Sequence, residues 1–168
     1  MSQLFFSLGT NLGRRRHNLQ QAIAGLRRYV TITAVSPVYE TDPWGPVPQP
    51  PFLNICVAAT TTLDPITLFT YCQQLEKELG REKTVRWGPR LIDIDLLFYD
   101  TLIYQNSALT IPHPRIGERA FVLYPLADIA PDFIHPQTGQ KIADMATAVS
   151  PDTIRRLPQP LLEPGAKN

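Results

Sequence analysis

Two aspartates, Asp93 and Asp95, stand two positions apart in an otherwise apolar segment. Side chains alternate along a strand, so both carboxylates are predicted on one face, with Cα atoms roughly 6.6 Å apart. At this spacing they repel one another when poorly hydrated, and both reach one or two hard cations. The opposite face of the strand is predicted to hold Ile92, Ile94, Leu96 and Phe98.

A basic segment comes directly before this strand. Residues 80–90 read GREKTVRWGPR and place four cations beside the aspartates: Arg81, Lys83, Arg86 and Arg90. Ion pairs from Arg86 and Arg90 to the two aspartates are one interpretation. The other is phosphoryl transfer, because carboxylates hold Mg²⁺ while Arg and Lys neutralise phosphate oxygens.

A third acid lies within the apolar stripe of a predicted helix at residues 65–79. With about 100° of turn per residue, Glu76 falls between Phe69 and Cys72 on the buried face. A carboxylate there needs a partner. A salt bridge to Arg81 and a ligand contact explain it equally well, and Gln73 lies three residues away on the same rim.

A proline-rich segment, ETDPWGPVPQPPFLN at residues 40–54, has five prolines between positions 43 and 51. No regular element tolerates so many. A polyproline ligand or a linker fits this composition, but its place between two strands favours a stiff loop that partly covers a site. Phe52 and Asn54 then offer an aromatic plane beside an amide, which suits a flat heterocycle; a core aromatic beside a satisfied Asn is the alternative.

The predicted elements place these residues on one sheet. Strands are predicted at residues 3–8, 30–39, 52–62 and 91–99, and helices at 18–29 and 65–79. Asp64-Pro65 marks a helix start, Gly80 a helix stop, and Pro37 an edge position or a bulge. The order β-α-β-β-α-β predicts an α+β, ferredoxin-like antiparallel sheet with both helices on one face. Residues beyond 100 are expected to extend this core and cover the open face.

Length and composition indicate one domain. The chain has 168 residues, 43% of them hydrophobic and 18% charged, so we predict a single globular domain over residues 1–168 with a loose tail from about 158. No apolar run is long enough to cross a bilayer, and the N-terminus lacks a secretory pattern, which favours the cytoplasm.

The charge and the cysteines exclude further classes. A formal net charge of +1 gives no general attraction to nucleic acid or to acidic membranes. Cys56 and Cys72 have neither zinc-ligand nor C-x-x-C spacing and are predicted as core residues. The segment after the first strand, GTNLGR at 9–14, lacks the ending of a Walker A motif.

Three specific segments occur in a fixed order: Y-E-T-x-P-x-G-P before F-L-N at 39–54, G-R-x-K before R-W-G-P-R-x-x-D-x-D-L-L at 80–97, and L-T-I-P-H-P-R-x-x-E-R-A-F-V-L at 109–123. Together they resemble the 6-hydroxymethyl-7,8-dihydropterin pyrophosphokinases of folate biosynthesis, over roughly residues 4–134. The resemblance implies the ferredoxin-like fold. It also implies an ATP-dependent transferase that moves the β,γ-pyrophosphoryl group to the pterin's hydroxymethyl oxygen and releases AMP.

The resemblance also implies roles for individual residues. Asp93 and Asp95 would hold two Mg²⁺ ions, and catalysis would further use Arg81, Lys83 and Arg90. The positions that match the pterin site are Thr41, Pro43, Trp44, Phe52, Asn54 and Phe121. The positions that match the ATP site are Gln73, Glu76, Trp87, Leu96, Thr110, His113 and Arg119. Loops after the first strand, at 42–51 and at 81–90, would close over the substrates and exclude water.

The chain departs from the family pattern at several loop positions. Phe52 stands where some members have Tyr, and Lys83 stands where Arg is common, which loses bidentate geometry to phosphate. Asp42, Trp44 and Pro114 also differ from some members. None of these positions is a predicted metal ligand.

Two other functions fit parts of the pattern. A nucleotidyl transferase or cyclase would use the same aspartate pair but release pyrophosphate instead of AMP. An RNA-binding module would need a basic sheet face and a specific aromatic pattern that these strands lack. We expect a monomer whose partners are ATP and the pterin, with no nucleic acid and no membrane.

Overall fold

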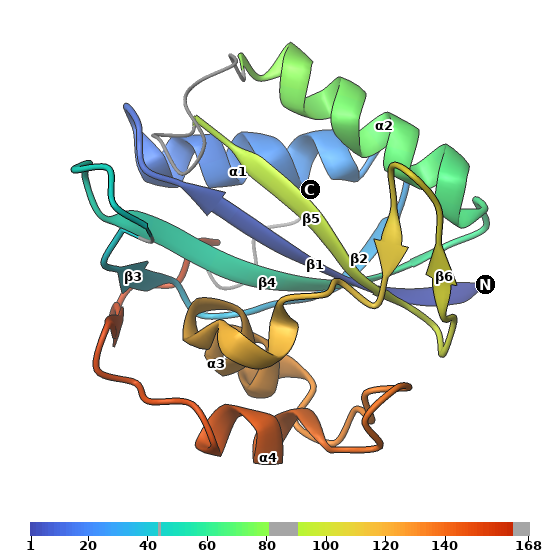
Figure 1. The fold of residues 1–168 in the computed structure, drawn as a ribbon. Coiled ribbons are helices and arrows are strands. Elements are labelled where there is room, and N and C mark those ends of the chain that lie inside the picture. Colours follow the sequence, from blue (N-terminus) through green and yellow to red (C-terminus); the bar gives the residue numbers. More distant parts are fainter. Residues whose placement is uncertain (44, 81–90, 163–168) are drawn as a thin grey trace.

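A computed structural model describes residues 1–43, 45–80 and 91–162 (Figure 1). The strands of its main sheet are β1 (Ser2–Thr10), β2 (Thr31–Val35), β3 (Tyr39–Thr41), β4 (Phe52–Thr61), β5 (Asp93–Tyr99) and β8 (Ile154–Arg156). The helices are α1 (Arg15–Leu26), α2 (Pro65–Glu78), the 3₁₀ helix η1 (Ile116–Glu118), α3 (Ala120–Ile129) and α4 (Ile142–Thr147). A small second sheet pairs β6 (Tyr104–Gln105) with β7 (Thr110–Ile111).

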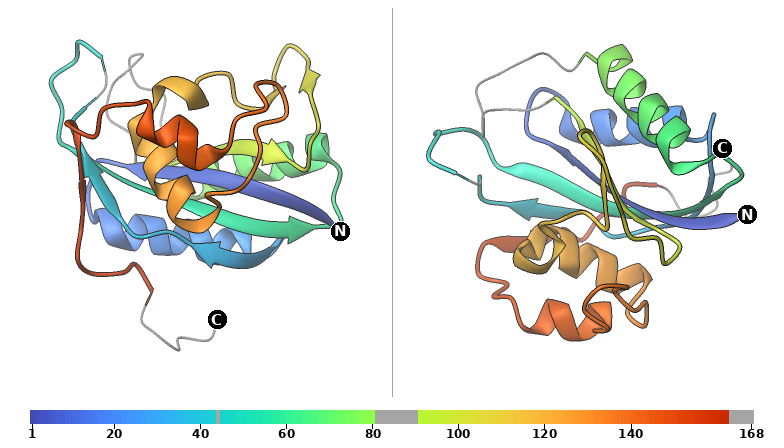
Figure 2. Two further views of the ribbon diagram at one scale, coloured as in Figure 1. Left: turned by 90° about the horizontal axis from the view of Figure 1, so that it is seen from below. Right: turned by 45° about the vertical axis from the view of Figure 1, so that its right-hand side comes forward.

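The main sheet has the order β5-β1-β4-β3-β8, with β2 also paired to β4. Each of its pairings is antiparallel. Helices α1 and α2 cover one face, and α3 and α4 cover the other (Figures 1 and 2). The predicted α+β, ferredoxin-like fold is therefore confirmed, and the segment beyond residue 100 covers the second face as expected.

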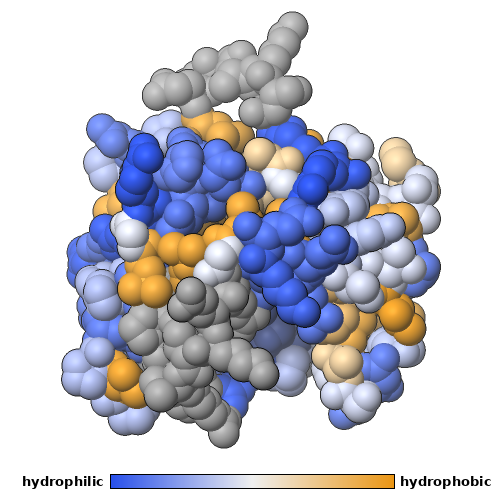
Figure 3. All heavy atoms as spheres, turned by 90° about the horizontal axis from the view of Figure 1, so that it is seen from above, coloured by the Kyte–Doolittle hydropathy of each residue, from blue (hydrophilic) through white to orange (hydrophobic). Residues whose placement is uncertain are grey.

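The sheet separates two hydrophobic clusters. The cluster toward α1 and α2 contains Leu8, Ile55 and Ile94, all nearly inaccessible to solvent. The cluster toward α3 and α4 contains Cys56, Leu97 and Leu123. The outer surface of the molecule on the side of α1 and α2 is mostly hydrophilic, and apolar side chains occupy smaller areas of it (Figure 3). None of the helices in the described ranges is long and apolar enough to span a membrane.

Helix α2 begins and ends where the sequence predicted. Asp64 accepts a hydrogen bond from the backbone N–H of Thr67 at 2.9 Å, and Pro65 opens the first turn. Gly80 follows the helix with a φ of +93°, a conformation that favours glycine. This helix packs on β5 and so sets the position of Glu76 relative to the aspartates.

The strand predicted at residues 30–39 is two strands. β2 ends at Val35 and β3 begins at Tyr39, with Pro37 between them. Proline has no backbone N–H to donate to a ladder, so the strand is interrupted there. A register shift between Ile32 and Ala34 further bends this segment.

Phe98 does not lie on the face predicted for it. Along β5, Phe98 pairs with Phe5 and Leu96 pairs with Phe6, so Leu97 is an extra residue relative to β1. Such a bulge reverses the alternation beyond it. Leu97 and Phe98 therefore both pack toward α3 and α4.

Residues 159–161, which were expected within a loose tail, pack on α1. Arg16 donates hydrogen bonds to the carbonyls of Gln159 at 3.0 Å and Pro160 at 3.3 Å. Gln20 donates to the carbonyl of Leu161 at 3.1 Å, and Leu161 is buried in the core with 4% exposure. This segment is thus held by both polar and apolar contacts.

Candidate active site

Predicted site residues of β4 and β5 lie in one row across the sheet, with β1 between them. Gly9 of β1 pairs with Asn54 on one side and with Asp93 on the other. In the next row of this face, Ser7 pairs with Cys56 and with Asp95. Directly paired residues share a face of a sheet, and Cys56 belongs to the cluster toward α3. Asn54, Asp93 and Asp95 therefore share the α3 face, and the same-face prediction for the aspartates is confirmed.

Gly9, which has no side chain, gives the Asn54 amide room in the middle of that row. A Cβ at position 9 would lie 2.8 Å from Asn54 Oδ1, which is closer than real contacts allow. With strands about 4.8 Å apart, Asn54 and Asp93 are separated by roughly 10 Å across this glycine. The strand predicted at residues 3–8 ends before Gly9, for which no role was predicted. A glycine next to a strand pattern was the available signal.

The amide of Asn54 is fixed by its neighbour on β3. Asn54 Nδ2 donates to Thr41 Oγ1 at 2.8 Å, and both side chains are buried. Thr41 also pairs in register with Phe52, which is half-buried. Three residues predicted to bind the pterin, Thr41, Phe52 and Asn54, are thus brought together. Pro43, two residues after Thr41, and Phe121, at the start of α3, are both half-buried.

Arg119 directs a cation toward the aspartates from the start of α3. Its guanidinium lies 5.4 Å from the ring centroid of Phe121. Burial lowers the pKa of Arg119, and the nearby carboxylate of Asp95 acts in the opposite direction, although arginine stays protonated. The buried Nε of Arg119 has no hydrogen-bond partner among the described residues. An unsatisfied buried donor is costly, so this atom is suited to an anionic ligand.

His113 is held as a neutral imidazole. Burial lowers its pKa to about 4, and the cations Arg119 and Arg115 add to the effect. Its Nδ1 accepts a hydrogen bond from the backbone N–H of Arg115 at 3.2 Å, and its own backbone N–H donates to the carbonyl of Leu97 at 3.0 Å. The Nε2 atom therefore carries the proton. Thr110, another predicted ATP-site residue, lies in β7 and is half-buried.

Three other predicted ATP-site residues lie elsewhere. Leu96 is buried in the cluster toward α1 and α2, on the face opposite the aspartates. Gln73 is exposed on α2. Glu76 is buried with 5% exposure, and its Oε1 accepts the backbone N–H of Ile94 at 3.0 Å.

Five predicted site residues fall outside the described residues: Trp44, Arg81, Lys83, Trp87 and Arg90. The same holds for the interpretations that pair Arg86 and Arg90 with the aspartates, or Arg81 with Glu76.

The aspartates provide the donor atoms that a hard cation prefers. Within the described ranges no group of three or more His, Cys, Asp or Glu side chains could hold a metal ion by itself. Mg²⁺ is commonly bound by one or two carboxylates together with substrate phosphates and water. Asp93 and Asp95, half-buried on one face and near the unsatisfied Arg119, fit this pattern.

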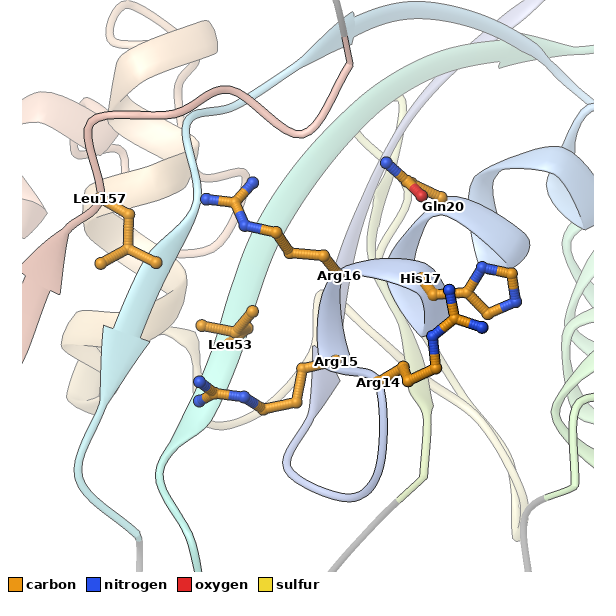
Figure 4. Close-up of a pocket in the computed structure, with 7 residues that line it drawn as sticks. All are labelled: Arg14, Arg15, Arg16, His17, Gln20, Leu53 and Leu157. Atoms are coloured by element: carbon orange, nitrogen blue, oxygen red, sulfur yellow. The ribbon is translucent and has the colours of Figure 1, made fainter.

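A separate cavity of about 450 Å³ lies at the start of α1 (Figure 4). Its lining consists of Arg14, Arg15, Arg16, His17, Gln20, Leu53 and Leu157. Arg15 and Arg16 extend toward the two leucines, whereas Arg14 extends toward His17 (Figure 4). Leu53 belongs to the cluster toward α1, so this cavity is on the other side of the sheet from the aspartates.

An antiparallel α+β sheet with paired carboxylates near an arginine fits an enzyme that transfers phosphoryl groups. A family profile described as 7,8-dihydro-6-hydroxymethylpterin-pyrophosphokinase (HPPK) matches residues 5–131. The chain belongs to this family, which confirms the resemblance predicted from the sequence.

Curated relatives agree with the family. A 2-amino-4-hydroxy-6-hydroxymethyldihydropteridine pyrophosphokinase of Bacillus subtilis is 47% identical over 127 residues, which cover 74% of this chain and 76% of the relative. The enzyme of the same name from Pseudomonas aeruginosa is 39% identical over 160 residues, covering 94% and 98%. The folic acid synthesis protein fol1 of Schizosaccharomyces pombe is 39% identical over 90% of this chain, but the chain spans only 21% of its length.

Solved structures show the same fold. A crystal structure of wild-type Plasmodium falciparum HPPK-DHPS superposes with a TM-score of 0.70 at 18% identity. The match covers 88% of this chain and 43% of that one.

Proposed function

We propose that the α3 face of the sheet, around Gly9, Asn54, Asp93, Asp95 and Arg119, is the active site of a pyrophosphokinase. The chain transfers the pyrophosphoryl group of ATP to the hydroxymethyl group of 6-hydroxymethyl-7,8-dihydropterin, a step of folate biosynthesis. The observation that carries this assignment is the row in which Gly9 separates Asn54 from Asp93. It provides a fixed amide for a heterocycle at one end and a carboxylate for a metal–phosphate group at the other.

The pterin end of the site is built for a flat, polar ring. Asn54 presents its amide in one orientation because Thr41 accepts one of its N–H groups. An amide with a fixed donor and acceptor reads the complementary edge of a heterocycle. Phe52 and Phe121 would contact the two faces of the ring. Pro43 and Trp44 would complete the pocket from the proline-rich loop.

The phosphate end of the site combines carboxylates with donors. Asp93 and Asp95 would hold Mg²⁺, for which we propose two ions; the bound metal would neutralise phosphate charge and orient the reacting oxygens. Arg119 would donate its unsatisfied Nε–H to a phosphate oxygen. His113, neutral with the proton on Nε2, would donate without adding charge. The other proposed contacts with ATP are Arg81, Lys83, Arg90, Gln73, Trp87, Thr110 and Leu96, whose buried side chain leaves only its backbone to contribute.

The reaction forms one bond and breaks one. The hydroxymethyl oxygen of the pterin bonds to the β-phosphorus of ATP, and the bond from that phosphorus to the α,β-bridging oxygen breaks. AMP leaves with the bridging oxygen, and the proton of the hydroxyl group passes to solvent. The chain's contribution is to hold the two substrates in line and to balance the charge that moves onto AMP.

The direct test is to incubate the purified protein with ATP, Mg²⁺ and 6-hydroxymethyl-7,8-dihydropterin and to separate the nucleotides by chromatography. AMP that forms only when the pterin is present is the expected result. ADP or free pyrophosphate as the product would instead support transfer at another phosphorus, as in a nucleotidyl transferase or cyclase.

A cytoplasmic location and a monomeric state remain predictions. Fractionation of cells with an antibody to the chain tests the first. Sedimentation equilibrium at several protein concentrations tests the second, because a self-associating chain would show an apparent mass that rises with concentration.

A further inference from the structure

The carboxylate of Glu76 is bonded to the backbone between the two aspartates. Its Oε1 accepts the N–H of Ile94 at 3.0 Å, and the side chain is 5% exposed. Among the strands in the described residues, β5 is at the edge of the main sheet and pairs with β1 alone. Glu76 therefore occupies the place that a carbonyl of another strand would take on the outer side of β5.

This hydrogen bond lies where the strand most needs support. In the pairing of β1 with β5, Asp93 opposite Gly9 is the last pair, and Asp95 opposite Ser7 is two residues further in. The end of an edge strand opens more readily than its middle. Helix α2 also packs on α1, so Glu76 links this end of the strand to an element that does not depend on β5 alone.

Burial makes an acid at this helix position costly. Burial raises the pKa of the Cys72 thiol to about 12, and the charge of Glu76, one turn further along the same buried helix face, adds to this effect. A third carboxylate close to the pair adds repulsion that a leucine at the same helix position would avoid. Glu76 is thus the charged residue within the apolar stripe of α2, and it is also the residue that contacts the backbone of β5 between the two aspartates.

We propose that Glu76 is a positioning residue, which fixes the start of β5 and thereby the spacing and direction of the Asp93 and Asp95 carboxylates. The inference rests on the proposed function of these two aspartates. It assigns Glu76 an action through the backbone of Ile94 and not a contact with ATP.

Three variants separate the possible roles. Glu76→Gln keeps a side-chain acceptor for Ile94 and removes the charge, whereas Glu76→Leu removes the acceptor. Cys72→Ala, one turn earlier on the same buried face of α2, is the matched control that loses packing but no bond to β5. For Glu76→Leu we expect the Mg²⁺ concentration at half-maximal activity to rise about 10- to 100-fold, as for the loss of other partners that orient metal ligands.

The other kinetic constants should change little. We expect KM for the pterin, and KM for ATP at saturating Mg²⁺, to stay within about twofold in each variant, and Glu76→Gln to resemble wild type. A rise in KM for ATP in Glu76→Gln would show that the carboxylate binds the nucleotide. An equal Mg²⁺ shift in Cys72→Ala would show a packing effect. Either result overturns the positioning role.

Two measurements without turnover complete the test. Amide hydrogen exchange of residues 91–99, with neither ATP nor metal present, should be faster in Glu76→Leu and unchanged in Glu76→Gln. Mn²⁺ binding in the presence of α,β-methylene-ATP, followed by electron paramagnetic resonance, should weaken in parallel. Unchanged exchange in Glu76→Leu would contradict the proposal.

Failure of a variant to fold, and failure of the proposed function, can each be distinguished from failure of the positioning role of Glu76. If Glu76→Leu does not fold, Glu76→Asp, which keeps the charge but shortens the reach, takes its place with the same expected direction. An unaltered Mg²⁺ dependence and exchange in Glu76→Asp would then contradict the proposal. If wild type forms no pterin-dependent AMP, the proposed function fails, while the exchange data still report whether Glu76 holds β5.

Discussion

Two groups of like charges differ in how the chain compensates them. At the start of α1, Arg14, Arg15 and Arg16 lie at the helix end where the macrodipole disfavours cations, and the first turn of this described helix holds no acid. Partners elsewhere in the chain offset this unfavourable placement of positive charge. Arg15 forms a salt bridge with Glu40 at 2.9 Å and donates to the carbonyl of Pro51, while Arg16 holds the C-terminal segment.

The aspartate pair on β5 is compensated differently. A cation close to it, Arg119, is half-buried, and its buried Nε has no hydrogen-bond partner in the described part of the chain. Arg15 and Arg16 have partners within the chain, so their role is structural. A buried donor that stays unsatisfied beside two carboxylates is suited to a ligand, in agreement with the proposed phosphate contact. The predictions below test this difference.

The largest effect is expected for Asp95→Ala. Loss of the Asp95 carboxylate should weaken the binding of the metal and so remove several kcal/mol of stabilisation of the charge in the transition state. Turnover should therefore fall by about 10³-fold or more. Steady-state AMP formation measures it, and circular dichroism should show a folded protein. Arg16→Ala, from the other charge cluster, is the control that should keep wild-type turnover. Wild-type-like activity in Asp95→Ala would remove the metal assignment.

Arg119→Ala should reduce kcat/KM for ATP by roughly 10- to 10²-fold, since a hydrogen bond to a charged group contributes about 1.5 to 3 kcal/mol. Arg119→Lys keeps the charge but lacks the Nε–H donor, and should recover only part of the loss. Initial rates over a range of ATP concentrations provide the measurement. Full recovery by lysine would show that the charge alone matters.

Asn54→Ala should weaken pterin binding by about tenfold or more, because the ligand's polar edge then lacks its partner. ATP binding should change little, since Asn54 lies across Gly9 from the aspartates. Separate calorimetric titrations with the pterin and with α,β-methylene-ATP distinguish the two. An equal loss of both affinities would contradict the division of the site.

Stability should fall as the pH decreases through the range set by His113. Its pKa is lowered to about 4 in the folded protein, compared with about 6.5 in an unfolded chain. Between these values the unfolded state binds more protons, so the stability present above pH 6.5 is lost toward pH 4, by about 1 to 3 kcal/mol. Urea unfolding at several pH values measures this. In His113→Gln the slope over this range should be smaller, and an identical slope would exclude His113 as its source.

The smallest effect is expected for Arg16→Ala. Its two hydrogen bonds to backbone carbonyls are partly exposed to solvent, so the free energy of unfolding should fall by no more than about 1 kcal/mol. Thermal unfolding measures this loss. A decrease in turnover as large as that of Arg119→Ala would erase the proposed distinction between the two clusters.

Local patterns predicted the element order and the shared face of Asp93 and Asp95, because alternation and capping depend on neighbouring residues only. The reversal at Phe98 escaped prediction because a bulge depends on how β5 meets β1. The sequence also indicated that Glu76 was anomalous but not its partner, which is a backbone amide brought close by tertiary packing. Gly9 was missed because its role is the space it leaves beside Asn54.

The need for glycine at position 9 links the stability of β1 to the position of the Asn54 amide. Glycine inside a strand costs roughly 0.5 to 1 kcal/mol relative to alanine, and β1 lies between two neighbours in the sheet. A single methyl group at position 9 would favour the strand but would press on Asn54 Oδ1, the atom proposed to recognise the pterin. Alanine at this position would therefore gain strand stability only by displacing the buried amide that Thr41 fixes, so position 9 can change only together with the recognition of the pterin.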